Sequence, residues 1–199
     1  MTDPIIPPNR ILFATDLSAR SDRALDRAIR LAREWNSELI VAHVVPLSAE
    51  AMLDELGQSN NVHRPSGLER ARHRVERDLG EGVKGARLVV TFGEAAEGIA
   101  KIAADEQCGL IVIGVARDET LGRMLLGTTV DRLVRNSAIR VLIVKQRAGR
   151  GYGEMLVPVD FSEASAYALA QAIRLFPHTD PTVLHVDDMP FAGTQDHMS

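Results

Sequence analysis

Short apolar runs alternate along the first three quarters of the chain with more polar stretches in which apolar residues recur every three to four positions. Such runs are typical of buried strands. The five runs are Ile11–Thr15, Leu39–Val45, Arg87–Thr91, Leu110–Ile113 and Val141–Val144. Between the runs, apolar residues recur every three to four positions, and this spacing predicts helices. The first helix is capped by Ser18 or Ser21, and its apolar positions run from Leu25 to Trp35. The others include Gly67–Leu79, Ala95–Glu106 and Thr128–Asn136.

Strands that alternate with helices predict a parallel sheet with right-handed crossovers. The expected fold is α/β: a five-stranded parallel, doubly wound sheet of the flavodoxin or Rossmann type, with helices on both faces. Ligands of such sheets bind beyond the carboxyl ends of the strands, where the strand order reverses. The strand ends to consider are Thr15–Ser18, His43–Pro46, Thr91–Glu94 and Gly114–Arg117.

The pattern that opens the chain returns near its end. An apolar run with an Asp-x-Ser turn and a strand with a His-Val pair both occur twice. The corresponding segments are Met155–Ser162 with Ile11–Ser18, and Thr182–Val186 with Ile40–Val44. We therefore expect one complete domain over residues 1–148 and a partial strand–helix–strand repeat over residues 149–199. Such a piece buries too little apolar surface to fold alone, so it should dock on the first domain or on a partner chain.

Composition narrows the class of protein. Apolar residues make up 45% and charged residues 25% of the 199 residues, as in a soluble globular protein. The formal net charge of −4 lacks the basic surplus that is typical of nucleic-acid binding. No apolar run reaches the roughly 18 residues that span a membrane, and the N-terminus lacks the layout of a secretory signal. The single cysteine, Cys108, indicates a reducing compartment. We expect a cytoplasmic protein without nucleic-acid or membrane partners, and an unreactive Cys108.

The segment after the fourth apolar run carries residues suited to a phosphate group. Gly114 would let the backbone approach a ligand closely. Gly127 precedes a helix that opens with Thr128 and Thr129, so free backbone N–H groups and two hydroxyls can meet an anion there. The alternative is that Gly127 and Thr128 only turn the chain and cap the helix.

The end of the first strand carries a carboxylate. Asp16 follows Thr15 directly and can accept hydrogen bonds from a ribose or from an adenine amino group. Alternatively, Asp16 is a turn residue that leads into the next helix. His43 recurs as His185, which indicates a structural role at the strand end rather than a catalytic one.

The chain resembles the universal stress protein family. The residues that carry the resemblance are Thr15-Asp16-Leu17-Ser18, Ala42-His43-Val44 and Ile113–Val130. The resemblance covers nearly all of Arg10–Lys145 and, more loosely, Glu154–Asp188. It implies the fold that the strand pattern predicts, and a homodimer that associates near the fifth strand.

Nucleotide-binding members of this family carry Gly-x-x-Gly, nine residues, and then Gly-Ser or Gly-Thr after the fourth strand. This chain has Gly114, Gly127 and Thr128 at three of the four positions, with Arg117 in place of the second glycine. The resemblance implies an ATP site, with magnesium bound through the phosphates, in which Val44 packs against the base. Arg117 either binds phosphate or closes the site.

Two hypotheses for the function follow. In the first, the protein is a stress-response or signalling module that binds ATP and hydrolyses it weakly or not at all, because the sequence offers no general base, arginine finger or Gly-Lys-Ser/Thr motif. In the second, the same fold does not bind nucleotides and acts through dimerisation or contacts with partners. A measured affinity for ATP separates the two.

Overall fold

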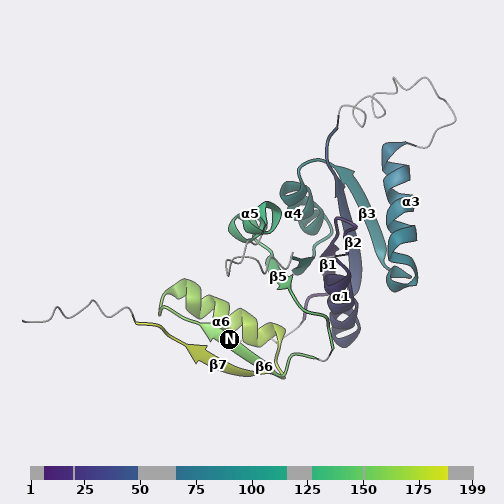
Figure 1. The fold of residues 1–199 in the computed structure, drawn as a ribbon. Coiled ribbons are helices and arrows are strands. Elements are labelled where there is room, and N and C mark those ends of the chain that lie inside the picture. The colour runs from purple at the N-terminus through teal and green to yellow at the C-terminus, as the bar shows by residue number, and fades with distance from the viewer. Residues whose placement is uncertain (1–6, 20, 49–65, 116–126, 150, 188–199) are drawn as a thin grey trace, which may run out of the picture. The chain divides into compact units, whose positions relative to one another are not determined.

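The computed structural model describes residues 7–19, 21–48, 66–115, 127–149 and 151–187. The chain divides into two compact units, of which the larger comprises residues 8–149 and the smaller contains the chain from residue 150 onward. Both units are built from parallel strands that are joined by helices (Figure 1). The sequence predicts a loop over Pro46–Pro65, from Gly and Asn residues that favour turns, and most of it lies outside the described residues.

A five-stranded parallel sheet with the order β3-β2-β1-β4-β5 forms the larger unit. Its strands are β1 (Arg10–Ala14), β2 (Glu38–Val45), β3 (Arg87–Phe92), β4 (Leu110–Gly114) and β5 (Arg140–Val144). The central strand β1 pairs with β2 and β4, so that Ala14 lies opposite both Ala42 and Ile113. Each strand begins and ends within one residue of its predicted position, and the predicted α/β fold is confirmed.

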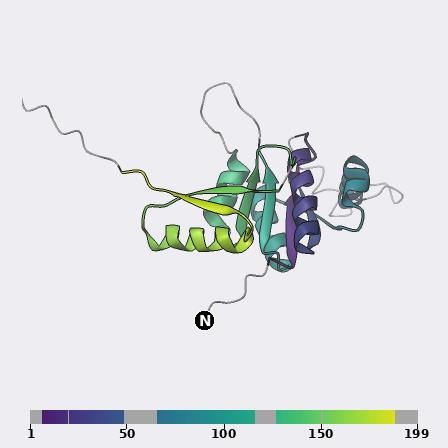
Figure 2. The ribbon, with the colours of Figure 1, turned by 90° about the horizontal axis from the view of Figure 1, so that it is seen from below.

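Helices lie on both sides of this sheet (Figure 2). They are α1 (Ser21–Trp35), α3 (Gly67–Leu79), α4 (Ala95–Asp105) and α5 (Thr128–Asn136), with the 3-10 helix η1 (Gly80–Val83) directly after α3. Two of them, α3 and α5, begin and end where the sequence predicts. Ser66 explains the sharp start of α3, because its side chain and that of Glu69 form a capping box.

The core of the larger unit surrounds β1. Successive residues of a strand point to opposite faces. Leu12 and Ala14 belong to a buried cluster with residues of α4 and α5. Ile11 and Phe13, which are also fully buried, point to the other face, where α1 packs against β1. Because both faces of β1 are covered, the turn that follows it is anchored at a rigid strand end.

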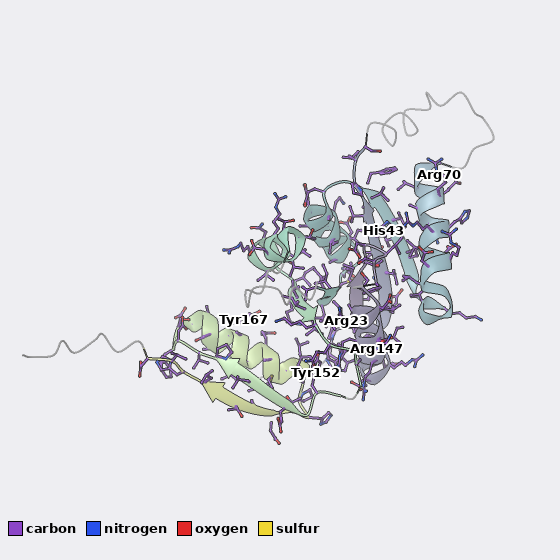
Figure 3. All side chains as sticks on the ribbon, viewed as in Figure 1. Arg23, His43, Arg70, Arg147, Tyr152 and Tyr167 are labelled. Atoms are coloured by element: carbon purple, nitrogen blue, oxygen red, sulfur yellow. The ribbon has the colours of Figure 1, made fainter. Side chains whose placement is uncertain are left out.

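The smaller unit contains one strand–helix–strand element. It consists of β6 (Glu154–Pro158), α6 (Glu163–Leu175) and β7 (Asp180–Leu184), and the two strands pair in parallel. Tyr152 packs edge-on against Phe176, with the ring centroids 5.0 Å apart; Figure 3 labels Tyr152 and Tyr167 of this unit.

The last strand ends earlier than the sequence predicts. We expected a strand through Val186, whereas β7 ends at Leu184. The equivalent strand β2 continues past its pairing with β1 because β3 pairs with its last residues, His43 to Val45. In the described part of the smaller unit, β7 pairs only with β6, so nothing extends it.

Candidate functional site

A hollow of about 270 Å³ opens at the carboxyl ends of β1 and β4. β1 and β4 are neighbours in the sheet. β2 lies beyond β1 and β5 lies beyond β4, so the chain adds strands in opposite directions from this pair, and the strand order reverses here. The walls come from the turn after β1, the ends of β2 and β4, and the starts of α4 and α5. This is the type of position at which doubly wound sheets bind ligands.

Backbone hydrogen bonds and a hydroxyl shape the turn after β1. The N–H of Thr15 donates to the carbonyl of Ala42 (3.0 Å), and the Thr15 hydroxyl accepts a hydrogen bond from the N–H of Leu17 (2.9 Å). Leu17 has a φ of 60°, in the left-handed region that non-glycine residues seldom adopt. The turn therefore has a defined and unusual shape at the edge of the hollow.

Two serines orient the carboxylate of Asp16. Its Oδ1 accepts hydrogen bonds from the N–H of Ser18 (2.9 Å), the hydroxyl of Ser18 (2.6 Å) and the hydroxyl of Ser21 (2.9 Å). Partial desolvation would raise the pKa of Asp16, but the hydrogen bonds from Ser18 and Ser21 outweigh it, so this pKa lies below its ordinary value. Asp16 is therefore an anion at neutral pH, and its Oδ2 takes no part in these three bonds.

One wall of the hollow is apolar. Val44 contributes from the end of β2, Ala95 and Ile99 from α4, and Ile113 and Val115 from the end of β4. Ile99, Ile113 and Val115 are buried, so this wall belongs to the core of the domain. An apolar wall beside a few fixed polar groups is typical of small-molecule sites.

Another part of the lining is the start of α5, which has no side-chain cap among the described residues. Gly127 occupies the N-cap position with a φ of 76°. Side chains cap α3, α4 and α6, and the capping residues are Ser66, Glu94 and Ser162. Thr128 and Thr129 line the hollow together with Gly127. Unbonded N–H groups and the positive end of the helix dipole make such a helix start suitable for an anion.

The structure brings seven of the eight candidate residues together around this hollow. They are Thr15, Asp16, Val44, Gly114, Gly127, Thr128 and Thr129. Arg117 lies outside the described residues. The segment Thr91–Glu94 does not line the hollow, because β3 is the outermost strand and lies two strands away from β1.

Sequence reasoning missed several residues of the site. Ser21, which donates to Asp16, could have been suspected from its helix-capping position three residues after Ser18. Ala95 and Ile99 carry no local signal, because helical spacing shows only that they belong to a helix. Their place in the wall depends on how α4 packs over β2.

His43 has a structural contact at the strand end, as its recurrence indicated. Its Nδ1 lies 2.8 Å from the carbonyl oxygen of Thr15, which ties the end of β2 to the turn after β1. Figure 3 labels His43. The residue does not line the hollow.

Cys108 is the single cysteine of the chain, and it is buried. Burial raises the pKa of the Cys108 thiol to about 11, which fits the expectation of an unreactive cysteine. Among the described residues, no three His, Cys, Asp or Glu side chains come together as a metal site. Every helix in the described part of the chain is too short or too polar to cross a membrane.

The model of the universal stress protein family matches residues 8–145. Universal stress protein YxiE of Bacillus subtilis (strain 168) is 30% identical over 150 residues, which cover 69% of this chain and 99% of that protein. The structure of the hypothetical protein MJ0577 is similar with a TM-score of 0.53 and 26% identity, over 71% of this chain and 98% of that one.

A larger structure is similar over more of the chain. A universal stress protein from Archaeoglobus fulgidus DSM 4304 has a TM-score of 0.65 at 22% identity, over 90% of this chain and 68% of its own. This coverage exceeds residues 8–149, so the similarity in fold extends into the smaller unit. Other family structures are complexes with cAMP (23% identity, TM-score 0.46) and with dAMP (20%, 0.42). The chain belongs to the universal stress protein family.

Proposed function

We propose that residues 8–149 bind an adenine nucleotide, with ATP as the ligand, as a stress-response or signalling module that hydrolyses ATP weakly or not at all. One observation carries this proposal. The hollow at the point of strand reversal combines a fixed carboxylate, an apolar wall and a helix start without a side-chain cap. These three surfaces suit the ribose or amino group, the base and the phosphates of one nucleotide.

The adenosine part would lie between Asp16 and the apolar wall. The carboxylate is ionised and oriented, so it can accept a hydrogen bond from a ribose hydroxyl or an adenine amino group. Val44 and Ile99 offer an apolar surface to the base. Thr15 fixes the turn through its hydroxyl, which accepts a hydrogen bond from the N–H of Leu17.

The phosphates would lie at the start of α5. Gly127, Thr128 and Thr129 present N–H groups and hydroxyls there, and Gly114 lines the hollow with them. Among the described residues, no carboxylate cluster stands ready to hold a cation. Magnesium would therefore be bound through the phosphates, where it neutralises their charge.

One departure from the family loop favours a second candidate function. Arg117 occupies the place of a family glycine, and in the second function it closes the site. The protein then acts as an interaction or dimerisation module that does not bind nucleotides. In the first function, the Arg117 guanidinium instead makes a charge-assisted bond to a phosphate, worth about 1.5–3 kcal/mol.

The proposal extends to assembly and location. We propose a homodimer that associates near β5, which family membership supports, and a cytoplasmic location, which the single, buried Cys108 supports. We also propose that the smaller unit is a partial second repeat. Its β6–α6–β7 order and its Asp160 turn, with Ser162 donating to Asp160 Oδ1, correspond to β1–α1–β2 and the Asp16 turn.

Calorimetric titration of the purified chain with ATP, with and without magnesium, tests the proposal. We expect measurable binding that weakens at high salt, and weakening of about 1–2 kcal/mol in Thr128→Ala through the lost hydrogen bond. Thr182→Ala, an exposed threonine of the smaller unit, is the matched control. The titration series includes cAMP and dAMP, and no binding of any adenine nucleotide would contradict the proposal.

Arg117→Gly then separates the two functions. If Arg117 binds phosphate, the variant loses affinity for ATP and its salt dependence flattens. If affinity rises sharply in the variant, Arg117 closes the native site, and the interaction module becomes the better account.

A further inference from the structure

Gly98 faces Val44 across the contact between α4 and β2. Val44 lines the hollow, and Gly98 precedes Ile99, which lines it too. A Cβ placed on Gly98 would lie 2.9 Å from Cγ2 and 3.0 Å from Cγ1 of Val44. Carbon atoms in favourable contact are about 3.5–4.0 Å apart. No side chain can therefore occupy position 98 while α4 and Val44 keep their places.

Rotation of the Val44 side chain does not relieve this conflict. Both of its methyl groups face Gly98, so two of the three staggered positions on Cβ point towards α4. Valine fills two of the three positions in every rotamer, so at least one methyl group always points there. A side chain at position 98 would have to displace Val44 or α4 itself.

Displacement of either element would change the same wall. α4 contributes Ala96, Ile102 and Ala103 to the buried core, so it resists movement away from the sheet. If α4 stays, Val44 moves; if α4 shifts, Ala95 and Ile99 shift with it. The start of α5, which also lines the hollow, contains neither group.

We infer that Gly98 is a specificity-determining position of the nucleotide site. Because Gly98 has no side chain, Val44 can pack against α4, and the hollow keeps enough depth on its apolar side for a two-ring purine base. This inference rests on the proposed function. Since the core holds α4 in place, a Cβ at position 98 displaces Val44, and a displaced Val44 removes depth that a purine needs and a single-ring pyrimidine does not. A glycine inside a helix lowers helix stability relative to alanine, so its presence in α4 calls for a packing reason of this kind.

The test compares ATP and UTP binding by calorimetry in the full chain and in Gly98→Ala. Wild type should prefer ATP, and Gly98→Ala should lower the ratio of ATP to UTP affinity about tenfold, the size of effect that one methyl group has in an apolar pocket. Gly82→Ala is the matched control, because a Cβ there would make only ordinary contacts of 3.6 Å with Leu25 and 3.7 Å with Ile29. Its ratio should equal that of wild type.

The double variant Gly98→Ala/Val44→Ala decides whether the two positions act together. Removing both methyl groups of Val44 makes room for the new Cβ, so the double variant should return the ratio to that of Val44→Ala alone. If Gly98→Ala alone does not fold, the double variant still tests the inference, because it should restore both folding and nucleotide binding. A wild-type ratio in folded Gly98→Ala, or a double variant without recovery, would overturn the inference while ATP binding by wild type still supports the proposed function. A wild-type chain that binds no nucleotide would instead remove the proposed function, and this inference with it.

Discussion

The turns that follow β1 and β6 have nearly the same geometry in two very different settings. Leu17 and Phe161 occupy the same place in these turns, with φ angles of 60° and 62°. The backbone N–H of Ser18 donates to Asp16 at 2.9 Å, and that of Ser162 donates to Asp160 at 3.0 Å. The short Asp-x-Ser sequence therefore suffices to produce the turn, because its hydrogen bonds are local.

The correspondence extends to the neighbouring strands. The β1–β2 ladder ends where Ala14 lies opposite Ala42, and the β6–β7 ladder ends where Pro158 lies opposite Leu184. The next residue of the second strand is a histidine in both cases. Nδ1 of His43 lies 2.8 Å from the carbonyl of Thr15, and Nδ1 of His185 lies 2.8 Å from that of Val159.

Burial distinguishes the two regions. Leu12 and Ala42 are fully buried, whereas their counterparts Leu156 and Leu184 are 61% and 43% exposed. In the larger unit, β4 and β3 border this strand pair and α4 packs over it. The described part of the smaller unit has only α6 against its two strands. Local sequence thus determines the turn, whereas the rest of a complete sheet determines whether the strands are buried.

The largest expected effect comes from shortening the two equivalent leucines. Leu12→Ala should lower the free energy of unfolding of the larger unit by about 3–5 kcal/mol, because it leaves a cavity in a closed core. Leu156→Ala should cost less than about 1 kcal/mol, because that side chain is largely in water. Denaturant titration can follow each unit separately, since the single tryptophan is Trp35 and both tyrosines, Tyr152 and Tyr167, lie in the smaller unit.

An equal loss in both variants would break the comparison. It would mean that the face carrying Leu156 is covered in solution, by a partner or by another part of the protein. Analytical ultracentrifugation of the wild-type chain is the companion measurement, because it detects a second copy of the chain.

The contrast also explains how far the sequence could predict this molecule. In the larger unit, the ends of the strands and of α3, α4 and α5 were predicted within one residue, because apolar runs and helical spacing are local signals. The early end of β7 was missed because strand length depends on a neighbouring strand, which extends β2 and has no counterpart beside β7 among the described residues.

The site shows the same division. Asp16, Gly127 and Thr128 could be named from motifs, and the structure places them around one hollow. The contact of Gly98 with Val44 could not be predicted, because it depends on the packing of α4 against β2. Whether these residues bind a nucleotide stays a prediction.

The second expected effect concerns the start of α5. The described part of the smaller unit has no counterpart of this helix. Gly127→Val should weaken ATP binding about a hundredfold, because a side chain there obstructs the approach of phosphate to the N–H groups, and charge-assisted hydrogen bonds are worth about 1.5–3 kcal/mol. The variant also carries strain of about 1–2 kcal/mol, since valine disfavours the positive φ of 76°.

Gly85→Val is the matched control for this strain. Gly85 has a φ of 87° and, like Gly127, open space around the position of a Cβ, but it does not line the hollow. It should lose similar stability and keep wild-type affinity for ATP in calorimetry. Wild-type affinity in Gly127→Val would remove the start of α5 from the site.

The smallest expected effect is the acid sensitivity of the two turns. Hydrogen bonds from Ser162 lower the pKa of Asp160 to about 2, and those from Ser18 and Ser21 keep the pKa of Asp16 below the ordinary 3.8 despite partial desolvation. Folding thus lowers both pKa values, so the stabilisation is complete above about pH 4 and is lost as pH falls through the folded values. NMR titration of the carboxyl groups should show Asp160 protonating near pH 2. Ser162→Ala should raise the pKa of Asp160 towards 3.8 without changing the pKa of Asp16.

A second measurement follows the stability of the smaller unit by tyrosine fluorescence. In Asp160→Asn, the decline in this stability between pH 4 and 2 should be shallower than in wild type. An Asp160 that titrates near 3.8 in the folded chain would show that its turn forms only in part in solution, and that the Asp-x-Ser sequence needs a closed core to hold its geometry.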